Sequence, residues 1–497
     1  MLQTIEVNQK GVLVNAGLAQ YYEFLIRQNL IDAKVRNDEL DEVLSYLSYL
    51  AWEMHGLNKK IIQEQELSEF NTRFSNEVHK TSFVQRLAML EKAKILLKKD
   101  DGYVFAYSYL SYFFIAKYLS EHLDEDQSLK DFVVRICNHL YIKENANIVL
   151  FLTHHSHSKW IVEEISSVLS ELLSDVEPLN LETDVVLLNT WVSEKARVVI
   201  DTTDVLRNQK NMRERDDNVA IYKEPEYTKE LSSIKELDQI SQLNLLFKTS
   251  EILGQILKGR YGSIRKDAKA ELIKELFEAP LRGINFFLSL VNSEPDALVQ
   301  EISSRIQTKV ATVDKEHADK VAKRFIFSAI GAVADSFLSR QGEIIGSPKL
   351  VDSIEQVAIE NGGLTYNLVS VSTQLSYPNH VPMDKIKFLA EQLDKNYFGY
   401  KILQGLTARH MYMFSLPAPE RHALAQAVGI DAHGQRDIEV RSGGAKKLPS
   451  KQSRINHPKT LIAQLQDSFL ANNESINKTL ARYKKKEKGE IPKEPTD

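Results

Sequence analysis

A change of periodicity within residues 1–125 constrains the fold more than any other feature of this sequence. Apolar residues recur at helical spacing in four consecutive stretches, which predicts four amphipathic helices. Two short β-prone runs joined by Lys-Asp-Asp-Gly follow, and this pattern is typical of a β-hairpin. A further helical pattern begins directly after the second run. The helices are expected over residues 19–31, 37–54, 68–74, 82–95 and 108–123, and the hairpin over residues 95–107.

Several helices followed by a hairpin is the element order of a winged helix-turn-helix module. The sequence therefore predicts such a module over residues 1–125, with the helix at residues 82–95 in the position of the recognition helix.

The segment Asp101–Leu123, "DGYVFAYSYLSYFFIAKYLSEHL", resembles the end of the winged-helix domain in STAND NTPases, the signal-transduction ATPases that include NACHT and NB-ARC proteins. Three later segments, at residues 145–156, 253–286 and 400–414, resemble the helical region that follows the ATPase core in bacterial NACHT-like proteins. The resemblance covers roughly residues 1–430, and it rests on packing patterns. The residues that occupy the pattern after the wing are Phe105, Tyr107, Tyr112, Phe113, Ala116, Tyr118 and Leu119.

Glycine and proline are scarce, with 20 and 13 residues in a chain of 497, and this favours long helices over many short strands. The expected fold class is mainly α, with a winged-helix-like module and its short hairpin, then a long helical array and a disordered basic tail. The expected domains are the winged-helix-like domain at 1–125, a helical region at 126–200, a charged linker at 201–230, a sensor-like helical domain at 231–430, and the tail at 431–497.

The cellular compartment follows from what the sequence lacks. Cys137 is the single cysteine, which excludes an intramolecular disulfide and fits a reducing compartment. The N-terminus has no signal-peptide profile, and no apolar run reaches the length that spans a bilayer. We therefore expect a cytoplasmic protein with no membrane partner. The tail from Asp437 onward carries 13 Lys or Arg against 8 Asp or Glu, so contact with nucleic acid is one reading of it and a solvated end is the other.

No phosphate-binding loop is recognisable. A P-loop needs glycines followed by Lys and Ser or Thr, and the chain contains no Gly-Lys dipeptide. The spacing of Gly254 and Gly259 in "GQILKGRY" imitates the motif inside a helical pattern, and "RVVIDTTD" at 197–204 imitates a Walker B strand. We expect no catalytic residues, no bound cofactor and no enzyme activity. If the resemblance holds, the nucleotide-binding core lies upstream of Met1, lies on another chain, or was lost.

The stretch "FLTHHSHSKW" concentrates three histidines, His154, His155 and His157. A closed zinc site needs four ligands at set spacings, and no cysteine or second histidine pair lies nearby in the sequence. The preferred interpretation is a helix corner, with Ser156 or Ser158 capping the next helix at Lys159 or Trp160. A binding role and a metal site are the alternatives, and no metal-ligating residue is assigned.

The recognition helix of a DNA-binding winged helix carries exposed basic residues. Here the helix carries Arg86, Lys92 and Lys94 with Glu91 among them, and the chain before the tail has a net negative charge. This composition disfavours DNA binding, which is kept as the alternative.

The resemblance implies the non-catalytic regulatory and sensor portion of a NACHT-like signalling or bacterial defence protein. Its partner is expected to be another protein or a further copy of itself. The alternative is a winged-helix DNA-binding regulator that uses the module or the tail, and an unrecognised enzyme ranks third. The winged-helix histidine that contacts nucleotide in that family has two candidates here, His55 and His79, and neither lies in an alignable motif.

Overall fold

The computed structural model describes residues 18–100, 102–156, 158–195, 205–211, 234, 237–309, 314–378 and 381–430. Helices dominate the described residues, and the strands among them form one small antiparallel sheet, so the expected mainly α fold is confirmed. The predicted tail at 431–497 and most of the predicted linker at 201–230 lie outside the described residues. The predicted domain boundaries stay predictions.

The chain divides into two compact units, and each contains segments that are far apart in the sequence. Unit 1 comprises Met1–Val176, Asp216–Pro280 and Ser347–Val357, and unit 2 comprises Glu177–Arg215, Leu281–Gly346 and Ala358–Asp497. One boundary falls within the helix α13 (Lys266–Ser293), directly after its internal proline, Pro280.

The N-terminal part of unit 1 contains the expected helices and hairpin. Its helices are α2 (Leu18–Asp32), α3 (Leu40–Gly56), α4 (Glu64–Glu77), α5 (Phe83–Lys92) and α6 (Ser108–His122), and its strands are β1 (Ile62–Gln63), β2 (Leu96–Lys99) and β3 (Gly102–Phe105). The strand β1 was not anticipated, because two residues carry no detectable alternation. It completes a sheet of order β1-β3-β2 in which both pairs are antiparallel.

Local chemistry explains the ends of these elements. The acidic residues Asp41 and Glu42 occupy the first turn of α3, where they complement the helix dipole. The helix α4 begins with a capping box between Gln63 and Glu66. At Gly102, a Cβ atom would lie 2.6 Å from the carbonyl oxygen of Ile62, so only glycine lets β1 approach β3 this closely.

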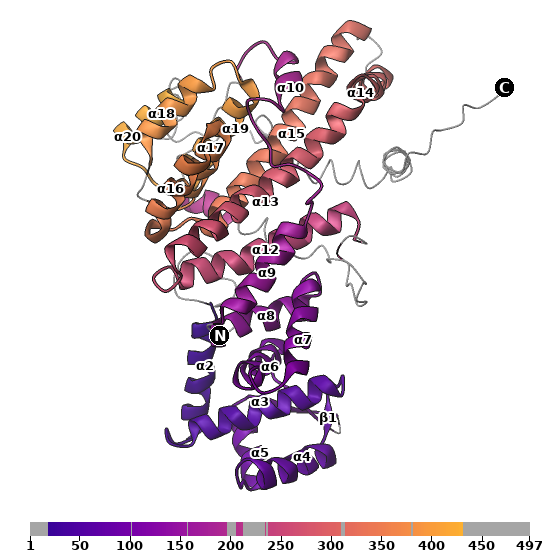
Figure 1. Ribbon diagram of the computed structural model, residues 1–497, viewed down its shortest axis with the longest axis vertical. Helices are drawn as coiled ribbons and strands as arrows, with labels where there is room; N and C mark the ends of the chain where they lie inside the picture. Colours follow the sequence, from indigo (N-terminus) through magenta and orange to yellow (C-terminus); the bar gives the residue numbers. More distant parts are fainter. Residues whose placement is uncertain are drawn as a thin grey trace, which may run out of the picture. The chain divides into compact units, whose positions relative to one another are not determined.

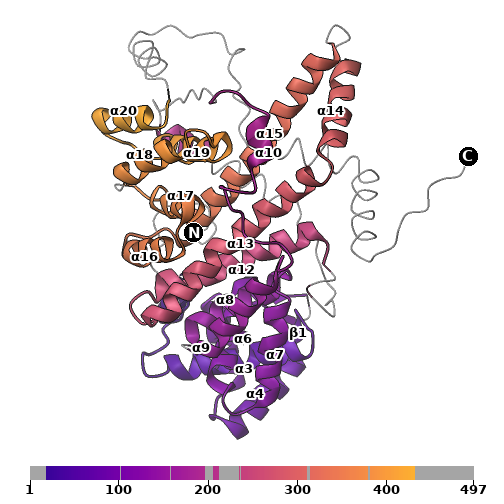
Figure 2. The ribbon, with the colours of Figure 1, turned by 45° about the horizontal axis from the view of Figure 1, so that its top comes forward.

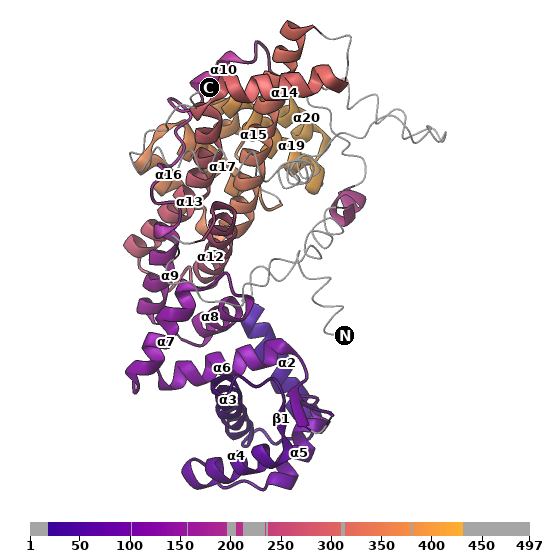
Figure 3. The same ribbon diagram turned by 90° about the vertical axis from the view of Figure 1, so that its right-hand side faces the viewer.

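The core of unit 1 forms around α6, which packs against α3 on one side and α8 (Lys143–His155) on the other (Figure 1). The side chains of Phe113, Phe114 and Leu119 are at most 1% exposed. Burial of such side chains is the main favourable term in folding, so α6 is the central element of the unit. The helix α5 packs against β2 beside the sheet (Figure 3).

The remaining described elements of unit 1 are helices, of which α7 and α12 pack against α8. The helix α7 (Gln127–Asn138) begins at Asp126, whose side chain accepts a hydrogen bond from the backbone N–H of Ser128 at 2.8 Å. The helices α9 (Lys159–Glu171) and α12 (Gln239–Gly259) pack against each other, and α12 also contacts α8. A short 3₁₀ helix, Pro348–Leu350, precedes α16 (Val351–Asn361), whose first part belongs to this unit.

Unit 2 is built on the helix α15 (Lys315–Ile345), which lies beside α14 (Pro295–Lys309) as Figure 2 shows. Further helices of this unit are α10 (Val186–Thr190), α17 (Gly363–Gln374), α18 (Met383–Gln392), α19 (Tyr397–Met413) and α20 (Ala418–Ala427). The helices α17 and α19 also pack against α15, and α18 and α20 pack against α19. The long helical array of the expected fold class is therefore present among the described residues.

Candidate functional site

The histidine-rich stretch forms the corner between α8 and α9 in unit 1. The helix α8 ends at His155, the backbone N–H of Ser156 donates to the carbonyl of Leu152 at 2.8 Å, and α9 begins at Lys159. The hydroxyl of Ser156 accepts a hydrogen bond from the backbone N–H of Ser158 at 3.2 Å. The expected helix corner is therefore present, but the expected capping is not, because Ser158 is the N-cap of α9 and makes no side-chain capping hydrogen bond. The third histidine, His157, lies outside the described residues.

Arg260, which follows α12, satisfies the carboxyl end of α8. Its Nη2 donates to the backbone carbonyls of Thr153 and Ser156, two of the acceptors that a helix end leaves open. Burial lowers the pKa of Arg260. This residue ends the false P-loop "GQILKGR", whose glycines Gly254 and Gly259 lie in α12. The motif is thus a helix with a structural arginine.

The corner also meets a carboxylate from a distant part of the chain, and no sequence motif joins the two. Glu23 of α2, His154 and His155 each place one ligand-type atom so that the three atoms lie within 4.8 Å of one another. The helices α2 and α8 pack side by side, and Nε2 of His154 lies 3.6 Å from Oε2 of Glu23. The other oxygen, Oε1 of Glu23, accepts a hydrogen bond from Nε of Arg27 at 2.9 Å.

Two groups of this cluster, the carboxylate of Glu23 and the imidazole of His155, have strongly shifted pKa values. The interaction with His154 lowers the pKa of Glu23 to about 2, with Arg27 adding to the effect against the opposing influence of burial. Burial lowers the pKa of His155 to about 3, and the nearby charges of His154 and Lys117 lower it further. At neutral pH the cluster therefore contains an ionised carboxylate and a neutral imidazole at His155.

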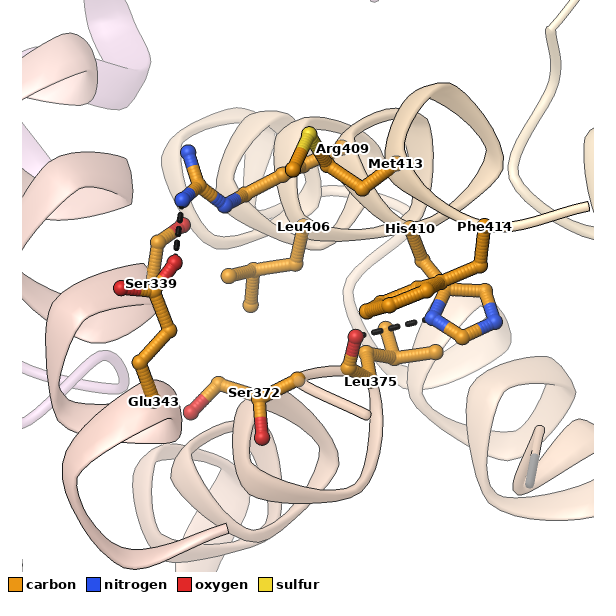
Figure 4. A pocket seen from close by; sticks show the side chains of 10 residues that line it. Ser339, Glu343, Ser372, Leu375, Leu406, Arg409, His410, Met413 and Phe414 are labelled. Carbon is orange, nitrogen blue, oxygen red and sulfur yellow. Dashed lines mark hydrogen bonds and ion pairs between the residues drawn. The ribbon is translucent and has the colours of Figure 1, made fainter. Parts of the chain in front are cut away.

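A second cluster of polar side chains lines a pocket in unit 2 (Figure 4). Arg409 of α19 pairs with Glu343 of α15, and Nδ1 of His410 donates to the carbonyl of Leu375 at 2.8 Å, as drawn in the figure. The cavity has a volume of about 40 Å³. It can hold a few water molecules, whereas pockets for cofactors and substrates measure roughly 300–1,000 Å³.

A buried carboxyl group, Asp335 of α15, lies in the same unit against Gly405 of α19. Its Oδ1 is shielded from solvent and accepts no hydrogen bond from the described part of the chain. Burial raises the pKa of Asp335 to about 6, although the charges of Arg409 and Lys401 oppose the shift. Burial also lowers the pKa of Lys401. Nothing in the sequence distinguished Asp335 from a surface carboxylate.

Arg86 of α5 is one of the basic residues considered for a DNA contact, and its side chain is shielded from solvent. Arg86 is 7% exposed and its Nη2 contacts the carboxylate of Glu42 on α3. Its Nε donates to Oγ1 of Thr81 at 3.2 Å, and its guanidinium lies over the ring of Tyr46 at 5.3 Å from the centroid. Arg86 therefore holds α5 to α3.

The structure also shows where the other candidate functional residues of the sequence analysis lie. Lys92 and Lys94 are exposed. Cys137 is buried on α7, and burial raises the pKa of its thiol, which makes the thiolate scarce. His55 lies with Nδ1 3.5 Å from Oε1 of Glu144 on α8, and His79 is exposed. The segment at 197–204 lies outside the described residues.

Comparison with known proteins gives one match. Residues 60–115 match the model of a family described as Novel STAND NTPase 4. The matched segment runs from before β1 to the interior of α6, so it contains α4, α5 and the β2–β3 hairpin. No curated protein and no solved structure matches the chain. The match supports a relation to STAND NTPases, a class of signalling and defence ATPases.

No helix among the described residues is long and apolar enough to cross a membrane.

Proposed function

We propose that this chain is the non-catalytic regulatory and sensor portion of a STAND, NACHT-like signalling or defence protein in the cytoplasm. It acts by recognising a protein partner or by assembling with copies of itself. The observation that carries the proposal is the family match over residues 60–115. At residues 101–115 the matched segment overlaps the stretch whose sequence resembles the end of the winged-helix domain of that class, and this overlap supports the same assignment.

The arrangement of unit 1 supports a winged-helix module. The order α3, β1, α4, α5, β2, β3 with a three-stranded antiparallel sheet is the order of that fold. In STAND proteins such a module locks or releases the nucleotide-bound state. Aromatic contacts tie the winged helix to α6, namely Phe105 with Phe114 and Tyr49 with Tyr118. This packing suits the role, because a displacement of the module is passed on to the helix that it packs against.

The absence of catalysis is proposed from the sequence. Without a Gly-Lys dipeptide the chain lacks the lysine that a P-loop directs at the β- and γ-phosphates. The false loop at Gly254 and Gly259 supports this view because its backbone N–H groups are committed to a helix. A nucleotide-binding module therefore acts from elsewhere in the system.

The long helices of unit 2 support the sensor role. They provide an extended helical surface, which is the kind of surface that recognises proteins.

The alternative, a DNA-binding regulator, uses the same module differently. It requires exposed cations on α5. Arg86 is committed to Glu42 and Tyr46. The outer face of the helix carries Val84, at 74% exposed, with Gln85, Glu91 and Lys92, so its one exposed cation stands beside an acidic residue. This face is poor in positive charge, which favours the regulatory proposal.

Binding measurements on the purified full chain test the proposal. Titration calorimetry with ATP and Mg²⁺ is expected to show no binding, and fluorescence anisotropy with duplex DNA is expected to show no saturable binding at physiological salt. Micromolar binding of ATP would overturn the non-catalytic assignment. DNA binding that is lost in a Lys92→Ala, Lys94→Ala double variant would establish the alternative instead.

The genetic context supplies a second test. A P-loop reading frame fused to this one or adjacent to it would support the proposal, and its protein product should associate with this chain in light scattering of the two purified components. A Val84→Ala variant then tests whether the outer face of α5 contacts the P-loop protein, because weaker association of this variant would place the contact there. The proposal fails if no association is found with such a product.

A further inference from the structure

We propose that Glu23, His154 and His155 form a binding site for a divalent transition-metal ion, zinc by the chemistry of the ligands. The site goes beyond the proposed function and does not depend on it. Two imidazole nitrogens and one carboxylate oxygen make up a common zinc ligand set, with water completing the coordination. Among the described residues, this is the one group of three or more His, Cys, Asp or Glu side chains whose ligand atoms converge in this way.

The distances suit a site that closes slightly when the ion binds. The three ligand atoms lie within 4.8 Å of one another, and the pair formed by Nε2 of His154 and Oε2 of Glu23 is at 3.6 Å. Ligands at about 2.0–2.1 Å from a tetrahedral zinc ion stand about 3.3 Å apart. Rotation of the Glu23 side chain and small adjustments of the two rings cover the difference, while the packed helices α2 and α8 stay in place.

A second observation points to a ligand at His155. Its Nε2 is buried and has no hydrogen-bond partner in the part of the chain that the structure describes. This nitrogen is therefore available as a ligand, because an ion needs an imidazole nitrogen that no other group occupies. The ring of His155 is held in place by an edge contact with the ring of Phe113, whose centroid lies 4.6 Å from that of the imidazole.

The charges around the cluster set the strength of binding. Arg27 occupies Oε1 of Glu23 and leaves Oε2 for the ion. Lys117 faces His155 from α6 and repels a cation, but its ammonium group pairs with Glu121. The competing account is a simple Glu23–His154 ion pair beside a buried histidine. The ion-pair account predicts no metal binding, so a measurement of bound metal distinguishes it from the proposed metal site.

The sequence alone did not identify this site because it shows only the two adjacent histidines. Glu23 lies in a different helix, far earlier in the chain, and no motif joins it to the corner. The expectation that these histidines hold no metal was based on the sequence neighbours, and the structure supplies the third ligand.

Zinc binding by the full chain tests the proposal. Protein freed of metal with a chelator is dialysed against Zn²⁺, and bound metal is measured by elemental analysis, with Co²⁺ absorption as a probe of the ligands. The expected result is one Zn²⁺ per chain. Glu23→Gln and His154→Ala should each weaken binding by at least about tenfold, since both remove direct ligands.

A matched control uses His317, whose Nδ1 lies 2.9 Å from Asp314 in an exposed pair that offers only two ligands. His317→Ala should keep the full zinc content. His155→Ala can loosen the fold through its contact with Phe113, so circular dichroism accompanies that variant and the conclusion rests on Glu23→Gln and His154→Ala. Wild-type protein without stoichiometric zinc, or undiminished binding in both of these variants, would overturn the proposal.

Discussion

Replacement of the buried carboxyl group of Asp335 by the neutral amide of asparagine should stabilise unit 2 at neutral pH and have little effect in acid. The ordinary pKa of 3.8 rises to about 6 at this position because the group is buried. A shift of this size corresponds to roughly 3 kcal/mol of differential stability between the two protonation states.

The sign follows from proton linkage. Because the folded protein binds this proton more tightly than the unfolded chain, the favourable contribution is complete below the unfolded pKa near 3.8. It is lost as the pH rises through the folded pKa near 6. The ionised carboxylate is then buried in the folded state with only the more distant charges of Arg409 and Lys401 to compensate it. Asparagine carries no charge at any pH, so Asp335→Asn should gain up to about 3 kcal/mol near pH 8.

Urea denaturation followed by circular dichroism measures this difference at several pH values between about 4 and 8. The difference between variant and wild type should grow from near zero at the acid end to its maximum above the folded pKa. The exposed Asp384 on α18 provides the control, and Asp384→Asn should show no such growth. A difference for Asp335→Asn that does not change with pH would refute the reasoning, as would destabilisation at every pH.

Three further predictions follow from buried groups. Phe113→Ala removes a side chain that is only 1% exposed, and it should destabilise unit 1 by about 3–5 kcal/mol in thermal or urea melts. The control Val84→Ala, at a side chain 74% exposed, should change the free energy of unfolding by no more than about half a kcal/mol. Equal effects of the two variants would contradict the docking of α6. Gly405→Ala should destabilise unit 2 in the same assay because the added methyl group would collide with Oδ1 of Asp335, and a neutral outcome would mean that α15 and α19 can separate. The thiol of Cys137 should resist a thiol reagent in the native protein and react after unfolding, since burial raises its pKa; rapid native reaction would show that α7 opens.

The predictions from the sequence succeeded where structure depends on neighbours along the chain. Apolar periodicity identified α3, α4, α5 and α6, and Lys-Asp-Asp-Gly identified the hairpin between β2 and β3. The scarcity of glycine and proline predicted the mainly helical architecture. The strand β1 escaped notice because its two residues are defined by pairing with β3 alone.

The partners of individual side chains were decided by tertiary structure. The sequence presents Arg86 only as a candidate for the disfavoured DNA contact, and the fold places it against Glu42. The sequence presents Arg260 only as the end of a false loop, and the fold places it at the carboxyl end of α8. In the same way, Glu23 reaches His154 only because α2 packs on α8. Helix and turn signals repeat at fixed spacings, so a sequence displays them. Contacts between distant helices have no fixed spacing, and burial, charge pairing and pKa shifts therefore arise only when the helices pack.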